Sequence, residues 1–204
     1  MTQKLSIFLL LCTLCLDLQG KPEVPLQAQW NESPLLLREY LLAVSDSLPD
    51  QATQVTEKIF LARQAELGTI TLQPYYGTKI GQDLSDLLKF QAMHLVDFIN
   101  AAKKDDAKKM ESELAILKQN ASAISCLISK VNPYISFGKM QDMLSKYLDL
   151  VSAMVADRLK MKWQEDIENY AKVRSHYNEL TSLLSEAITN AFPPKEEPKA
   201  KSSV

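Results

Sequence analysis

The chain has 204 residues, of which 46% are hydrophobic, and its 23 Lys and Arg nearly balance its 25 Asp and Glu, for a formal net charge of −2. The two signs of charge are mixed along the chain, which argues against the strongly basic surface that binding to nucleic acid or to an anionic membrane would need. A chain of this length suits one domain with a single hydrophobic core.

The first twenty residues have the features of a secretory signal peptide. Lys4 is followed by an apolar run over residues 5–16 that only Ser6 and Thr13 interrupt. A run of about 12 residues is shorter than the roughly 20 that cross a bilayer, so we expect cleavage and not a membrane anchor. Cleavage fits best after Gly20, and the expected product is a secreted or periplasmic protein without a transmembrane segment.

Removal of residues 1–20 would also leave a single cysteine. Cys12 and Cys15 lie in the signal, and a leucine precedes each of them, which argues against lipid anchoring. The remaining Cys126 lies in an apolar run over residues 124–128, so we expect a small buried residue and not a nucleophile. The mature protein would then have no internal disulfide, and its fold must depend on packing.

The first predicted helices follow an N-terminal loop over residues 21–32. Ser33 is a suitable helix cap, the proline after it fits the first helical position, and this helix extends to about Leu48. A proline and an aspartate then end it and cap a second helix, whose apolar residues follow a 3.6-residue period until Gly68. We expect residues 69–77 to be a connector, since a lone strand there would have no partner.

The clearest helical pattern begins at Thr78, where apolar residues mark one stripe over about 26 residues. The turn at residues 104–106 supplies an acid to cap a fourth helix, and its apolar residues have matching spacing. Asn132 and Pro133 end that helix. The helix that begins at Thr78 and the fourth helix are therefore predicted to form an antiparallel hairpin.

A last periodic segment covers residues 139–191 without any Gly or Pro. As one straight helix it would be roughly 80 Å long, about twice the length of its neighbours, so we expect a bend or short break near Lys160 to Trp163. Residues 193–204 are predicted to be a disordered charged tail. The sequence thus predicts an all-α fold, an up-and-down bundle of five to six helices over residues 33–192.

The sequence lacks the motifs that common catalytic, metal and nucleotide sites need. Neither His94 nor His176 follows a glutamate by three residues, as a dimetal bundle site requires, and zinc would need more closely spaced ligands. A phosphate-binding loop and a nucleophile elbow are also missing. We therefore predict no cofactor and no metal, and we attribute the two glycosylation sequons at Asn31 and Asn120 to chance.

Two further groups of residues have a structural and a functional interpretation. Tyr75 and Tyr76 are predicted to cover one end of the bundle, with a stacking platform for a ligand as the alternative. The acids Glu165, Asp166 and Glu168 are predicted to form a solvated helix face.

A series of short motifs follows in a fixed order over about residues 33–193. They are Arg38, Leu48-Pro49-Asp50, Pro74-Tyr75-Tyr76-Gly77, Asn100-Ala101-Ala102-Lys103, Asn120-Ala121, Asn132-Pro133-Tyr134, Arg158-Leu159, Asp166-Ile167, Tyr170 and Phe192-Pro193. Together they resemble a family of small bacterial all-helical proteins without an established activity, often given inconsistent transferase or kinase names. The resemblance implies a helical bundle, of which this chain would be a divergent member with a signal peptide.

The family pattern has histidines at the positions of Ser33, Gln91 and Tyr147 and an acid at that of Met154. In the relatives such a set looks like a polar or metal-binding site in the core of the bundle. This chain has poor or non-ligating side chains at all four positions. The resemblance therefore implies that the site of the relatives is not kept here.

Arg38, Asn120 and Asp166 do match the family, and they lie on segments otherwise devoted to packing. We expect a buried hydrogen-bond network that holds the helices in register, with a ligand site as the alternative. His94 lies one helical turn from Gln91, near the same face, so it is the candidate for a relocated polar site.

Two functional hypotheses follow. The leading one is an exported, non-enzymatic protein that works by binding, with an unidentified protein partner favoured over a small molecule. The rival is a ligand- or metal-binding bundle, with or without enzymatic activity, that has an altered polar site around Arg38, Gln91, His94 and Tyr147. A third reading is an envelope component that associates with itself.

Overall fold

The computed structural model describes residues 26–193, and every element in that part of the chain is a helix. Of these residues 89% are helical and none lies in a strand, which confirms the all-α fold class. The predicted signal peptide over residues 1–20, including Cys12, Cys15 and the cleavage point, lies outside the described residues, as do residues 21–25 and the tail over 194–204.

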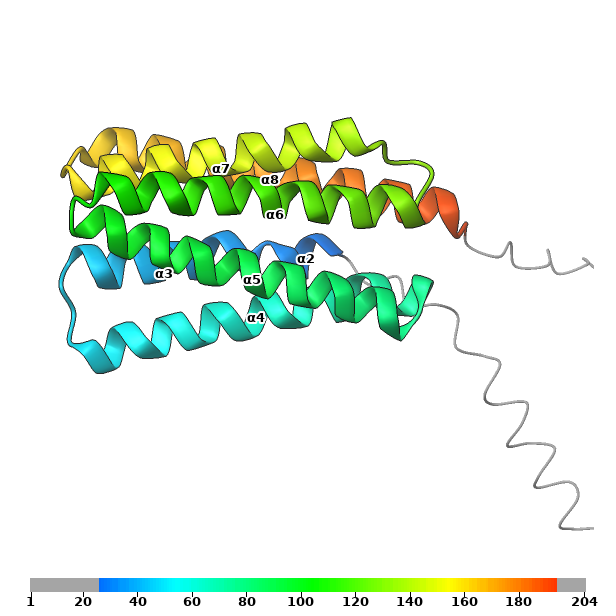
Figure 1. Ribbon diagram of the computed structural model, residues 1–204, viewed down its shortest axis with the longest axis horizontal. Helices are drawn as coiled ribbons and strands as arrows, with labels where there is room; N and C mark the ends of the chain where they lie inside the picture. Colours follow the sequence, from blue (N-terminus) through cyan, green and yellow to red (C-terminus); the bar gives the residue numbers. More distant parts are fainter. Residues whose placement is uncertain (1–25, 194–204) are drawn as a thin grey trace, which may run out of the picture.

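Residues 26–193 form six long helices and one short helix. Their bounds are α2 Leu26–Trp30, α3 Glu32–Ser45, α4 Asp50–Tyr76, α5 Thr78–Lys103, α6 Ala107–Val131, α7 Phe137–Leu159 and α8 Trp163–Ala191. The long helices lie side by side, and short loops join the ends of consecutive ones (Figure 1). Each packs on its neighbours in sequence, and α8 also contacts α2 and α3.

The interior follows directly from the apolar stripes of the sequence. On α5 the side chains of Leu84, Leu88, Leu95 and Ile99 are each at most 5% exposed, at successive spacings of four, seven and four residues. Matching stripes on the other helices join them in one core. Burial of these stripes is the main favourable contribution to folding.

Two helix starts have the side-chain caps that their sequences favour. Asp106 accepts a hydrogen bond from the backbone N–H of Lys109 at 3.0 Å, and Ser136 accepts one from that of Lys139 at 3.2 Å. The predicted end of α6 at Asn132 is confirmed too.

The connector predicted over residues 69–77 is wrong, because α4 continues through Gly68 to Tyr76. The glycine serves close packing and does not end the helix: a Cβ at Gly68 would lie 2.1 Å from the backbone nitrogen of Ser85 on α5. Pro74 removes one helical N–H near the end of α4, and Gly77, with φ of 86°, then terminates the helix.

The loop predicted over residues 21–32 is also wrong where the structure describes it. Leu26–Trp30 forms α2, and α3 begins at Glu32, so that Ser33 is a buried helical residue and not a cap. Leu26 and Trp30 are 4% exposed, and the Trp30 indole donates a hydrogen bond of 2.8 Å to the Thr71 hydroxyl. The core therefore begins at least as early as residue 26.

The segment predicted to bend near Lys160 to Trp163 consists of two helices, α7 and α8, that pack against each other. Met161 has a φ of 58°, and the N–H of Lys162 donates to the carbonyl of Asp157 at 2.9 Å, which closes α7 with a left-handed turn. Ser47 and Asp105 close α3 and α5 in the same way. Glycine is the usual residue in such turns. None of these three turns has one, so the usual sequence signal for the end of a helix is missing.

Tyr75 and Tyr76 pack on Phe192, with ring centroids 5.4 and 5.1 Å apart, and so they join the ends of α4 and α8. This agrees with the predicted packing role of the two tyrosines. Within residues 26–193, no helix combines the length and apolarity that crossing a membrane requires.

Replacement of Gly68 tests the close approach of α4 and α5. Gly68→Ala should destabilise the protein by about 1–3 kcal/mol, because the new methyl group overlaps the backbone at Ser85. Gly138→Ala is the matched control: a Cβ there meets nothing within 4 Å, so we expect an effect between neutral and a stabilisation of about 1 kcal/mol. Urea unfolding measures both, and equal stability of the two variants would contradict the packing.

Candidate functional site

The six candidate residues of the sequence do not converge on one site. Arg38 and Asp166 meet between α3 and α8, Gln91 and Tyr147 line an internal cavity, and His94 faces α6. Asn120 is separate, and its amide donates a hydrogen bond of 3.1 Å to the carbonyl of Leu87 that ties α6 to α5. Each place is described in turn.

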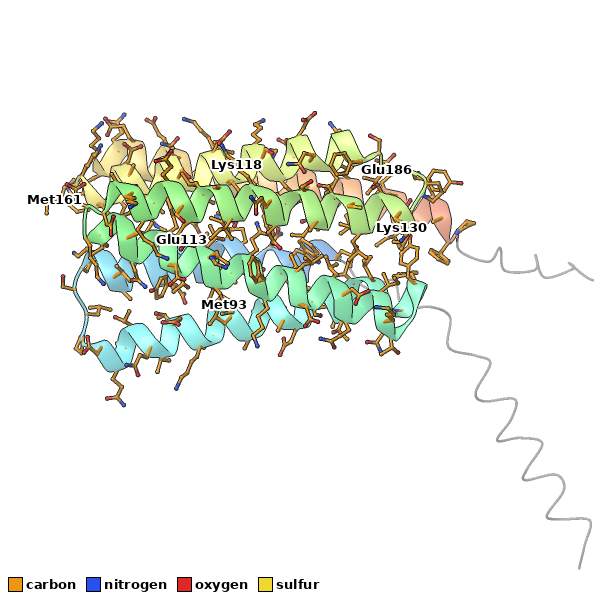
Figure 2. The ribbon with its side chains drawn as sticks, viewed as in Figure 1. Met93, Glu113, Lys118, Lys130, Met161 and Glu186 are labelled. Atoms are coloured by element: carbon orange, nitrogen blue, oxygen red, sulfur yellow. The ribbon has the colours of Figure 1, made fainter. Side chains whose placement is uncertain are left out.

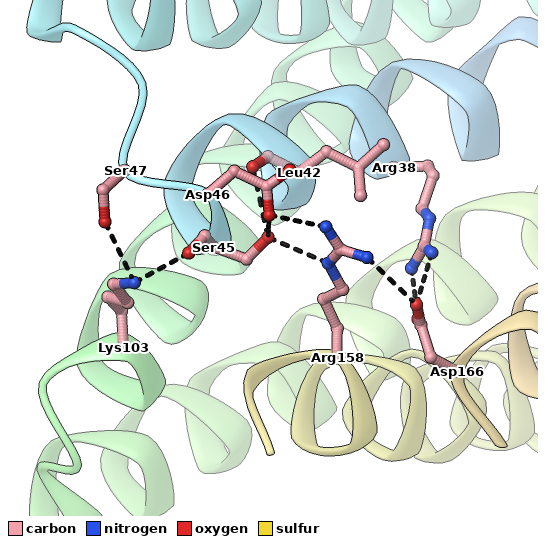
Figure 3. A network of polar contacts seen from close by, with 8 residues as sticks. All are labelled: Arg38, Leu42, Ser45, Asp46, Ser47, Lys103, Arg158 and Asp166. Carbon is pink, nitrogen blue, oxygen red and sulfur yellow. Dashed lines mark hydrogen bonds and ion pairs between the residues drawn. The ribbon is translucent and has the colours of Figure 1, made fainter. Parts of the chain in front are cut away.

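The first place is an ion-pair network at the end of α3 (Figure 3). Both amino groups of the Arg38 guanidinium donate to the Asp166 carboxylate, one of them at 2.5 Å to Oδ2. Asp166 is 1% exposed and Arg38 is 8% exposed. A bidentate contact of this kind holds two helices in one register, as expected for a buried network.

Arg158 extends the network from α7. Its Nη1 lies 3.7 Å from Asp166 Oδ2, its Nε donates to the Ser45 hydroxyl at 2.9 Å, and its Nη2 donates to Asp46 Oδ1 at 2.5 Å. The hydrogen bonds from Ser45 and Arg158 lower the pKa of Asp46. Lys103 completes the arrangement by donating to the Ser45 carbonyl at 2.9 Å, so α3, α5, α7 and α8 are linked.

Asp166 corrects the prediction that its acidic cluster is a solvated face. Glu165 and Glu168 are exposed as expected, but Asp166 points inward. Residues 166, 173, 177 and 180 lie on one side of α8, and all of them are buried. The spacing of Asp166 from the other buried residues of α8 was therefore visible in the sequence. The exposed acids Glu165 and Glu168 nevertheless made this segment resemble a solvated face.

The second place is a cavity of about 20 Å³ in the middle of the bundle. Ser33, Gln91 and Tyr147, three of the four positions that the sequence comparison singled out for a core site, line this cavity together with Gln64 and Tyr177. Met154 is fully buried and does not line it. The lining has no charged side chain, and its size suits about one water molecule.

The third place is a buried acid on α6 (Figure 2). Glu113 is 1% exposed, and its carboxylate contacts His94 Nδ1 at 2.6 Å and Lys109 Nζ at 2.5 Å. Burial opposes ionisation of Glu113, but the hydrogen bonds from Lys109 and His94 outweigh it and lower the pKa of this carboxyl. His94 thus points to α6, whereas Gln91 lines the internal cavity.

Glu113 could also bind a metal together with its neighbours. Ligand atoms of His94, Asp97 and Glu113 lie within 4.8 Å of one another, and imidazole and carboxylate groups suit zinc and similar ions. The ammonium group of Lys109 already supplies a positive charge to Glu113, so an ion would have to displace it. Sequence reasoning missed Glu113, although its spacing from Leu117 and Asn120 places it on the buried face of α6.

His176 and Cys126, the one cysteine among residues 26–193, have plain structural settings. His176 is 2% exposed, and its Nε2 lies 2.8 Å from the Met143 carbonyl, which links α8 to α7. Cys126 is exposed, and the prediction that it is buried is wrong. Ile124 and Ile128 face the core and Cys126 lies between them, on the opposite side of the helix.

No family model, no curated protein and no solved structure matches this chain. The chemistry of the three places is therefore argued from their own residues.

Asp166→Asn tests the first place. The variant leaves the Arg38 guanidinium buried without its counter-charge, and we expect a loss of about 3–5 kcal/mol in the free energy of unfolding. The control is Asp83→Asn, which breaks the exposed pair with Lys79 and should cost less than about 1 kcal/mol. Similar effects of the two variants in urea unfolding would contradict the role of Arg38 and Asp166.

Glu113→Gln tests the third place through the pH dependence of stability. Since the folded protein lowers the pKa of Glu113 from its ordinary value of 4.5, the carboxylate stabilises the fold above that value, and the stabilisation is lost as the pH falls through the folded pKa. The stability difference between wild type and Glu113→Gln should be largest near neutral pH and shrink on acidification. Glu111→Gln, on the exposed side of α6, is the control, and a pH-independent difference would contradict the assignment.

Proposed function

We propose that this chain is an exported up-and-down helical bundle that works by binding another protein, without catalysis. The observation that supports it is an exposed apolar surface between α3 and α8, here called the α3–α8 strip. The strip consists of the exposed Leu35, Trp163 and Ile167 together with the half-buried Leu42 and Tyr170. The signal-like residues 1–20 support export, and the ordered motifs support membership of the small bacterial helical family as a divergent member.

The two edges of the strip are fixed by the buried ion pair. Trp163, Ile167 and Tyr170 are four and three residues apart on α8, so they lie on one face of that helix. Leu35 and Leu42 lie one turn before and one turn after Arg38 on α3. Because Arg38 binds the residue next to Ile167, and its guanidinium lies 5.2 Å from the Tyr170 ring centroid, the two edges are held together.

The exposure of the strip is what needs an explanation. Leu35, Trp163 and Ile167 are 48%, 52% and 64% exposed, although each is large and apolar. Single exposed apolar residues are ordinary, but several of them on two helices that contact each other are a candidate for a surface that another molecule covers. Trp and Tyr are also the residues that most often anchor protein interfaces.

The partner that fits is an amphipathic helix with acidic residues beside its apolar face. Arg158 lies over the Trp163 ring, 4.7 Å from its centroid, and Arg174 lies 5.9 Å from that of Tyr170. Among residues 26–193, neither Arg174 nor Lys160 makes an ion pair, so both cations are free to attract an acidic partner. Two helices side by side are a common receptor for a third.

The rival function, a ligand- or metal-binding bundle, has one observation in its favour, the approach of His94, Asp97 and Glu113. The internal cavity gives it little support, because about 20 Å³ is too small for an organic ligand. Elemental analysis of the purified protein separates the two functions, since a stoichiometric transition metal would favour the rival.

A photo-reactive residue in place of Ile167 tests the proposed interaction. Ile59 on α4 is the matched control, because it is 50% exposed and lies outside the strip. In cells that express the full chain, we expect a crosslink from position 167 to one protein, in the fraction outside the cytoplasm and on a chain shortened by about 20 residues. We also expect the crosslinked segment to be helical and acidic.

Competition makes this assay specific. Unlabelled wild-type protein in excess should suppress the crosslink at least tenfold, whereas Ile167→Glu should not, because it places an acid in the strip. Equal crosslinking from positions 59 and 167, or none from 167, would contradict binding through the strip. A crosslink on an uncleaved chain inside the cytoplasm would contradict export.

A further inference from the structure

We propose that the cavity in the middle of the bundle binds one water molecule that hydrogen-bonds to the side chains of Gln91 and Tyr147. This site is independent of the proposed function, because it lies in the interior and the α3–α8 strip lies on the surface. It would be a built-in site for a small neutral hydrogen-bonding ligand, lined by residues of α2, α3, α4, α5, α7 and α8.

Six elements meet at the cavity. The polar lining comes from Ser33 on α3, Gln64 on α4, Gln91 on α5, Tyr147 on α7 and Tyr177 on α8. The indole of Trp30 on α2 and several leucines complete the wall. Side chains around a cavity of about 20 Å³ are within reach of one molecule inside it.

Two of these polar groups need a hydrogen-bond partner. Gln91 is 6% exposed and Tyr147 is 3% exposed, yet neither side chain makes a hydrogen bond to another of residues 26–193. Buried amides and hydroxyls almost always have a partner, since leaving one without costs free energy. One water molecule between Gln91 and Tyr147 would be a hydrogen-bond partner for both side chains.

The neighbouring groups are arranged to complete the site. The side-chain amide nitrogen of Gln64, Nε2, donates to the Ser33 hydroxyl, which leaves the side-chain oxygen of Gln64 available as an acceptor. Burial raises the pKa of Tyr147 well above its ordinary range, so its hydroxyl stays protonated and can donate. A buried water commonly makes about three hydrogen bonds, and Gln64, Gln91 and Tyr147 can provide them.

Water is the ligand that fits these features. The volume is above the roughly 10–15 Å³ that one water needs and far below that of an organic molecule. A metal ion is a poor fit, because all the polar lining groups are neutral hydroxyls and amides. An empty cavity of this size would be expected only with an apolar lining.

A crystal structure of the purified protein at about 1.5 Å resolution tests the site directly. We expect a solvent peak within about 3.2 Å of both the Gln91 amide and the Tyr147 hydroxyl. A cavity without such a peak, or a direct hydrogen bond between the two side chains, would overturn the proposal.

A double-mutant cycle tests the site in solution. Gln91→Leu and Tyr147→Phe each remove one contact to the water, so their effects should couple by about tenfold in the unfolding equilibrium constant, which is 1.4 kcal/mol. The control pairs Gln91→Leu with Tyr40→Phe, because the Tyr40 hydroxyl is buried but donates to Asn100 and does not line the cavity. That pair should combine independently, to within about twofold.

The two measurements decide together. Coupling between positions 91 and 147 with independence between 91 and 40 supports the proposal, whereas independence in both cycles overturns it. If the double variant does not fold, the solvent peak in the wild-type crystal decides alone.

Discussion

The contact between Arg38 and Asp166 is the constraint on which much of the structure depends. It joins α3 to α8 across 128 residues of sequence, in an interior position where neither charge could remain alone. Removing two ions from water is costly, and their attraction offsets that cost only when the geometry is good. The pair is therefore better understood as a device that selects one register of the two helices than as a source of stability. Arg158 and Asp46 surround it with further charge, so the cluster stays balanced.

Close packing between α4 and α5 is a second constraint, and it depends on very small residues. Gly68 and Gly81 lie where the two helices touch, and a Cβ at either would come within 2.6 Å of the other helix. This pair of long helices can approach so closely that backbone contacts backbone. The α4–α5 pair has the most extensive contact of any two helices in residues 26–193, and α3 and α6 pack against it.

The sequence predicted most of the helices because their apolar periodicity is strong, as on α5 and α6. The prediction failed where the same structural role can be filled by different residue types, or where one residue type fits two different roles. Gly68 resembles a helix terminator but serves packing, and Met161 closes α7 in a conformation that usually calls for glycine. Of the three residues expected in one buried network, Arg38 and Asp166 contact each other, whereas Asn120 bonds separately to the carbonyl of Leu87. Glu113 was missed because a buried acid depends on partners from other turns and helices, which periodicity does not identify.

The α3–α8 contact has a consequence for the order in which the molecule folds. The helix pairs with the most extensive contacts are neighbours in sequence, so short loops close them at small entropic cost, and they can form early. The ion pair between α3 and α8 joins residues 128 positions apart, so its contact costs more loop-closure entropy and forms later. Only then do the exposed residues Leu35 on α3 and Ile167 on α8 belong to two helices that are in contact. A partner that recognised both helices, as proposed above, would consequently bind finished molecules and pass over incomplete ones.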